Sequence, residues 1–146
     1  MASSGPETSN TPAAGHATPT ISTHVLDTET GRPAAGVHVT LYKLGEDDRP
    51  IRLTQALTDG DGRVRDLLER PLSPGVYRLE FNLARLRGSA IDSDIDPVAG
   101  SGVGSDKGAG PFFRRISLDL RIGDVTRSYH VPLLLAPYSL TTYRGS

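Results

Sequence analysis

The chain has 146 residues, with 16 Lys and Arg, 17 Asp and Glu and a formal net charge of −1, and this length suits one domain with a buried core. The balanced charge gives no electrostatic reason to expect nucleic acid or a membrane surface as a partner. The chain contains no cysteine, which excludes disulfides, thiol nucleophiles and cysteine-bound metals.

Residues 1–20 consist mainly of Ser, Thr, Ala, Gly and Pro, without a periodic apolar pattern. Such a segment buries too little apolar surface to offset its ordering entropy, so the sequence predicts a disordered tail and a folded domain over residues 21–146. The tail has neither the basic start nor the apolar stretch of a secretory signal, and no apolar run approaches the roughly 20 residues of a membrane-spanning helix. We therefore expect a cytoplasmic protein.

From Ile21 onward the apolar residues recur with a period of two, which is typical of strands with one buried face. The alternating stretches are Val37–Leu41, Ile51–Leu57, Gly75–Phe81, Phe112–Ile122, Arg127–Leu134 and Leu140–Tyr143. Turn residues separate them, as in Thr58–Gly62. This pattern predicts an all-β antiparallel sandwich or barrel.

One stretch departs from the pattern, at residues 83–110. Leu83–Ser89 places leucines at helical spacing and predicts a short helix. Ala90–Gly110 is rich in Gly, Ser and Asp, and its composition favours a long, mobile loop.

Three blocks of the chain resemble, in order, those of the transthyretin-like proteins. The first is Thr23–Asp27 with Gly31–Ala34, the second is Asp61–Val64, and the third is His130–Ser146. The terminal Tyr-Arg-Gly-Ser is similar to the 5-hydroxyisourate hydrolases of this family and differs from the hormone-carrying transthyretins. The resemblance covers residues 21–146, and the loop at Ala90–Gly110 is its main departure.

This resemblance implies a transthyretin-like antiparallel sandwich of two four-stranded sheets with one short helix. It implies a homotetramer whose sites lie in the channel between two dimers. The implied activity is the hydrolysis of 5-hydroxyisourate to 2-oxo-4-hydroxy-4-carboxy-5-ureidoimidazoline in urate (purine) degradation, without a cofactor. The alternative is a carrier of a small hydrophobic ligand, which needs an apolar channel and has no use for paired histidines with an arginine.

The resemblance assigns specific residues to the site. It implies catalytic roles for His24, Arg63, His130 and Ser146. It implies substrate binding by the same four residues and by Tyr143. Without the resemblance, a strand histidine is more often structural and an arginine after a turn is more often solvated, as we expect for the nearby Arg65.

These residue types suit the implied hydrolysis. Histidine can activate water near neutral pH, and one of His24 and His130 is expected to be the base while the other positions substrate or supplies a proton. The sequence leaves open which histidine is which. The Arg63 guanidinium can stabilise charge on the carbonyl oxygen, and the Ser146 hydroxyl can orient water or substrate. Two histidines without a third ligand at the usual spacing do not predict a metal.

The period of two also sets the direction of the two histidines. His24 alternates with Val25, and His130 alternates with Tyr129 and Val131. Because successive side chains of a strand point to opposite faces, both imidazoles are predicted on the face away from the buried residues.

Overall fold

A computed structural model describes residues 18–84 and 110–145. Within these residues the chain forms nine strands and no α-helix. The strands are β2 (Ile21–Asp27), β3 (Arg32–Pro33), β4 (His38–Leu44), β5 (Pro50–Leu57), β6 (Arg63–Val64), β7 (Gly75–Asn82), β8 (Arg115–Ile122), β9 (Tyr129–Ala136) and β10 (Ser139–Thr142). No helix capable of crossing a membrane is present in the described part of the chain.

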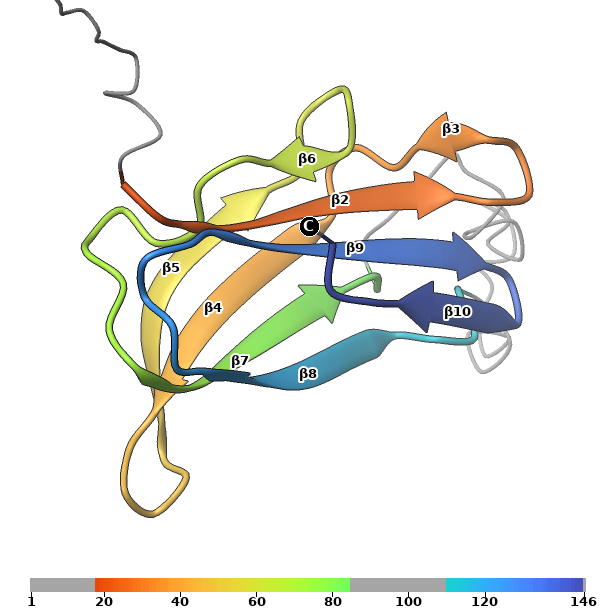
Figure 1. The fold of residues 1–146 in the computed structure, drawn as a ribbon. Coiled ribbons are helices and arrows are strands. Elements are labelled where there is room, and N and C mark those ends of the chain that lie inside the picture. Colours follow the sequence, from red (N-terminus) through yellow and green to blue (C-terminus); the bar gives the residue numbers. More distant parts are fainter. Residues whose placement is uncertain (1–17, 85–109, 146) are drawn as a thin grey trace, which may run out of the picture.

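The strands form two sheets that face each other (Figure 1), which confirms the predicted β-sandwich. One sheet has the order β5-β4-β7-β8 and is antiparallel throughout. The other has the order β10-β9-β2-β3, and β6 also pairs with β2. In this second sheet β2 and β9 run parallel, whereas the other pairs are antiparallel.

The second sheet differs in detail from the expected four antiparallel strands. Its fifth strand arises because β3 and β6, of two residues each, pair with successive parts of β2. β6 pairs with Thr23 and His24, and β3 pairs with Leu26 and Asp27. Strands this short carry no periodic signal, so the sequence pattern did not predict them.

Alternate strand residues form the core between the sheets, as the period of two predicted. The buried residues that alternate in this way are Ile21, Thr23, Val25 and Asp27 in β2, Tyr77, Leu79 and Phe81 in β7, and Tyr129, Val131, Leu133 and Leu135 in β9. Full burial of a Leu, Ile, Val or Phe side chain contributes about 1.5–3 kcal/mol relative to exposure. These strands are therefore held mainly by their inner faces.

The strand predicted at Phe112–Ile122 begins later than expected. β8 starts at Arg115 because its partner β7 ends at Asn82, and the ladder between them stops there. Phe112 is 67% exposed and lies outside the strand. Its ring packs edge-on against Phe113 at a centroid distance of 5.0 Å.

Two predictions fall largely outside the described residues. The helix expected at Leu83–Ser89 and the loop at Ala90–Gly110 are described only at their ends, where Leu83 is buried directly after β7. Residues 1–17 of the expected tail are also outside the described part, and the first described strand, β2, begins at Ile21.

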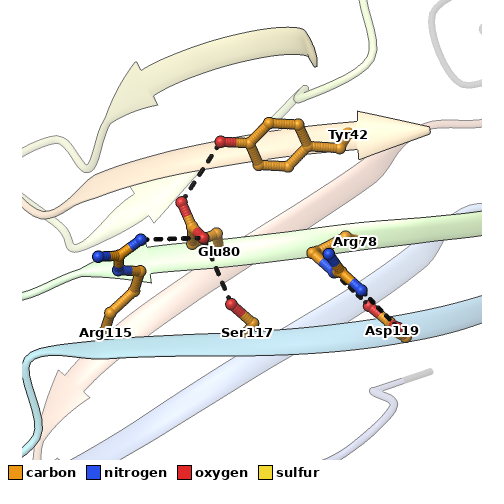
Figure 2. A network of polar contacts seen from close by, with 6 residues as sticks. All are labelled: Tyr42, Arg78, Glu80, Arg115, Ser117 and Asp119. Atoms are coloured by element: carbon orange, nitrogen blue, oxygen red, sulfur yellow. Dashed lines mark hydrogen bonds and ion pairs between the residues drawn. The ribbon is translucent and has the colours of Figure 1, made fainter. Parts of the chain in front are cut away.

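Polar pairs link neighbouring strands on the outer face of the first sheet (Figure 2). Arg78 donates to both carboxylate oxygens of Asp119, at 2.8 and 3.1 Å. Glu80 accepts hydrogen bonds from the hydroxyls of Tyr42 and Ser117, both at 3.4 Å. Exposed pairs of this kind contribute at most about 1 kcal/mol each, so they support the strand register without dominating stability.

Candidate functional site

The candidate site forms on the outer face of the second sheet, where β2 lies between β6 and β9 (Figure 1). In the register of these strands, His24 lies opposite Arg63 and Ser22 lies opposite His130. Directly opposite residues of neighbouring strands project from the same face of a sheet. The two histidines and the arginine are therefore brought together on the face away from the core.

A hollow of about 180 Å³ lies on this face. Its lining residues are Ser22, Thr23, Arg63, Val64, Arg65 and His130. The exposed Arg65 side chain pairs with Asp61 at 3.8 Å. The hollow thus combines an imidazole, a hydroxyl and guanidinium groups, which are the groups required to bind and polarise a carbonyl compound.

A larger hollow, of about 510 Å³, lies elsewhere, beside the edge strand β8. It is bordered by residues 117–122 and 142–144 together with Tyr129 and Val131. No histidine is found among these described lining residues, so its size does not outweigh the chemistry of the smaller hollow. Tyr143, which is 54% exposed, borders this larger hollow in a single chain.

His130 is held at both its backbone and its ring. Its Nδ1 atom lies 2.9 Å from the Ser22 hydroxyl oxygen. The Gly145 amide donates to the His130 carbonyl oxygen at 2.6 Å, and a Cβ atom on Gly145 would lie 3.0 Å from His130 Cδ2. The end of the described chain therefore folds back over β9 and contacts this histidine directly.

The surroundings of His130 lower its pKa below the usual value of 6.5. Burial is the largest cause, and the positive charges of Arg63 and His24 lower the pKa further, because both oppose the charged imidazolium. A histidine with a lowered pKa is neutral near pH 7 and can accept a proton from water.

A tight turn presents Arg63 to β2. The Asp59 carboxylate accepts hydrogen bonds from the amides of Asp61 and Arg63, at 2.8 and 3.0 Å. The Val25 amide donates to the Gly62 carbonyl at 2.7 Å. Gly62 has φ +76°, and a Cβ atom there would collide with the Val25 carbonyl oxygen. Only glycine permits this close approach, and the approach aligns Arg63 with His24.

The predicted site residues divide into two groups. His24, Arg63 and His130 share one face, whereas Ser146 lies outside the described residues and Tyr143 borders the larger hollow. Within residues 18–84 and 110–145, no cluster of three or more His, Asp or Glu side chains is arranged to hold a metal ion.

Sequence reasoning missed one contact, that of Ser22 with the ring of His130. The period of two placed Ser22 on the same strand face as His24, and that was the available signal. Its contact with His130 depends on the register between β2 and β9, which periodicity does not specify.

Comparisons with known proteins agree on one family. The sequence model of the HIUase/Transthyretin family matches residues 21–145. The 5-hydroxyisourate hydrolase of Deinococcus radiodurans is 40% identical over 130 residues, which cover 88% of this chain and 97% of that protein. The structure of Klebsiella pneumoniae 5-hydroxyisourate hydrolase has a TM-score of 0.63 at 33% identity, and the match covers 88% of this chain and 99% of that one.

Transthyretin from sea bream, solved in complex with thyroxine, has a TM-score of 0.62 at 24% identity. The match covers 86% of this chain and 93% of that one. At this identity the likeness supports the fold alone.

Two glycines with nearly equal φ angles test the role of the turn before Arg63. We expect Gly31→Ala to destabilise the protein by about 1 kcal/mol, since φ is +77° but nothing lies within 4 Å. Gly62→Ala is expected to cost about 2 kcal/mol more, because it adds a collision with β2. Urea unfolding measures both variants. Equal stabilities would contradict the close-approach explanation.

The pKa of His130 is expected to depend on Arg63. Arg63→Gln removes a positive charge that opposes protonation, so the pKa of His130 should rise toward 6.5. It should remain below that value, because burial still acts. NMR titration of the ring measures the shift, and Arg78→Gln on the opposite sheet is the control. A pKa that stays constant or falls in Arg63→Gln would show that the guanidinium does not act on this ring.

Proposed function

The chain belongs to the HIUase/Transthyretin family, and we propose that it hydrolyses 5-hydroxyisourate to 2-oxo-4-hydroxy-4-carboxy-5-ureidoimidazoline in urate degradation. The shared face of His24, Arg63 and His130 supports this activity. A carrier of a hydrophobic ligand would gain nothing from two imidazoles beside a guanidinium, because desolvating them opposes binding of an apolar molecule.

The reaction opens the six-membered ring of the substrate at a carbonyl. The oxygen of a water molecule bonds to the carbonyl carbon, and the bond from that carbon to the ring nitrogen breaks. One water proton passes through a base to the departing nitrogen, and the new carboxyl group loses its proton near neutral pH. The protein therefore has to move a proton and stabilise a transient oxyanion.

We assign the proton acceptor to His130 and the second imidazole, that of His24, to substrate positioning or proton supply. The lowered pKa of His130 supports this assignment, because the ring is neutral at pH 7. Burial is the largest cause of the lowered pKa, followed by Arg63 and His24. Arg63 stabilises the oxyanion with the positive charge of its guanidinium.

The end of the chain supplies the remaining proposed contacts. Ser146 orients water or substrate through its hydroxyl. The hydrogen bond from the Gly145 amide to the His130 carbonyl supports this role, because Gly145 directly precedes Ser146 and lies against the histidine. Tyr143 borders the larger hollow in a single chain, and its contact with substrate stays a prediction.

We also propose that the protein is a homotetramer with its sites in a channel between two dimers. In one chain His24 and Arg63 are half-buried, and a second copy across this face would exclude water and strengthen the electrostatic contacts. Analytical ultracentrifugation measures this assembly.

The cytoplasmic location is likewise a proposal, which cell fractionation tests.

The activity and the site residues are tested together by ultraviolet spectroscopy. Urate oxidase generates 5-hydroxyisourate from urate, and we expect the protein to accelerate the decay of its absorbance. Alanine at His24, Arg63, His130 or Ser146 should lower kcat/KM roughly 10²-fold or more, because each removes a proton-transfer or charge contact from the transition state.

His38→Ala and Arg78→Ala are the matched controls, since both residues lie in the first sheet. Both should keep wild-type rates. Near-normal turnover in both His24→Ala and His130→Ala would refute the site, and a wild-type protein without activity would refute the function.

A further inference from the structure

The hydroxyl of Ser22 lies against one nitrogen of the His130 ring, at 2.9 Å from Nδ1. Both residues lie in strands that are paired along the whole length of β2, so the backbone holds the two side chains opposite each other. The next hydroxyl of β2, that of Thr23, donates to the Val131 carbonyl in the core at 2.6 Å. The Ser22 hydroxyl therefore projects from the opposite, outer face of the strand toward the ring of His130.

The contact has a chemical consequence for the imidazole. A neutral ring carries its proton on one nitrogen only, and the other nitrogen accepts protons. If Nδ1 carries the proton and donates it to the Ser22 oxygen, the lone pair lies on Nε2. When the ring takes up a second proton at Nε2, the hydrogen bond from Nδ1 to Ser22 is retained. The Ser22 oxygen can therefore accept the hydrogen bond from Nδ1 both before and after proton transfer at Nε2.

The opposite edge of the ring is also occupied. The close approach of Gly145 lies on the Cδ2 side of His130, where a Cβ atom would be only 3.0 Å away. Rotation of the ring by half a turn would exchange Nδ1 with Cδ2. A carbon would then face the Ser22 hydroxyl, and the hydrogen bond would be lost. Ser22 therefore favours one of the two ring orientations.

We propose that Ser22 is a positioning residue for His130, whose hydroxyl oxygen accepts the hydrogen bond of Nδ1–H and so directs Nε2 to water or substrate. This inference rests on the proposed function, in which His130 exchanges a proton with water. Ser22 itself forms no covalent bond and transfers no proton to substrate. Its role is to select the tautomer and the orientation of the ring.

Steady-state kinetics with three variants tests the role. Ser22→Ala is expected to lower kcat about threefold to tenfold with little change in KM, which corresponds to the loss of one hydrogen bond that matters in the proton-transfer step. Ser22→Thr keeps the hydroxyl on a residue that suits a strand, and it should restore most of kcat. Ser117→Ala removes an exposed hydroxyl from the first sheet and should have no effect.

Wild-type kcat in Ser22→Ala would overturn the proposal. An equal loss in Ser22→Ala and Ser22→Thr would also overturn it, because the side-chain volume and not the hydroxyl would then be the cause.

A second measurement does not depend on activity. Long-range ¹⁵N–¹H NMR spectra distinguish the two neutral tautomers of a histidine, and the signal absent from His130→Ala identifies this ring. We expect the proton on Nδ1 in the wild type, and a shift toward the Nε2–H tautomer in Ser22→Ala. A wild-type ring with its proton on Nε2 would overturn the proposal.

The two measurements separate this inference from the proposed function. A wild-type protein that does not hydrolyse 5-hydroxyisourate refutes the function, while the NMR result still decides which tautomer Ser22 selects. An active wild type whose His130 carries its proton on Nε2 leaves the function intact and refutes the role of Ser22.

Discussion

The parallel pairing of β2 with β9 is the constraint on which the site depends. It joins a strand near the start of the chain to one near its end, and it extends from Ile21 opposite Tyr129 to Asp27 opposite Leu135. The inner faces of both strands are buried. Because side chains alternate, a slip of one residue would turn these buried side chains outward and the histidines inward. The hydrophobic core therefore also fixes the positions of His24 and His130.

Arg63 is held by a shorter strand pairing than that of β2 with β9. β6 has only two residues. Arg63 is therefore positioned mainly by the turn before β6, through the Asp59 hydrogen bonds and the close approach of Gly62.

The positive charge of Arg63 near His130 has an electrostatic cost. The folded pKa of His130 is below its unfolded value, so the unfolded chain binds more protons just below pH 6.5. The contribution of this group to stability therefore falls as the pH decreases through that range, and the ring is neutral at pH 7.

The period of two in the sequence predicted the longer strands, the buried faces of β2, β7 and β9, and the outward direction of both histidines. These are local properties, since alternation needs only neighbouring residues. Neighbour relations between strands are not local. The parallel register of β2 with β9, the pairing of β3 and β6 with β2, and the start of β8 at Arg115 each depend on a partner far away in the chain. Ser22 was missed for the same reason. The family resemblance, and not the pattern, selected Arg63 over Arg65 and proposed Ser146.

The proposed activity requires that two histidines from strands far apart in the chain work as one site on one face of the sheet. A double-mutant cycle on His24→Ala and His130→Ala tests this cooperation, with kcat/KM for 5-hydroxyisourate as the readout. Residues that act as a unit give non-additive losses. If the two histidines act together, the double variant is scarcely slower than the slower single variant. Losses that multiply in full, as for two independent positions, would contradict it.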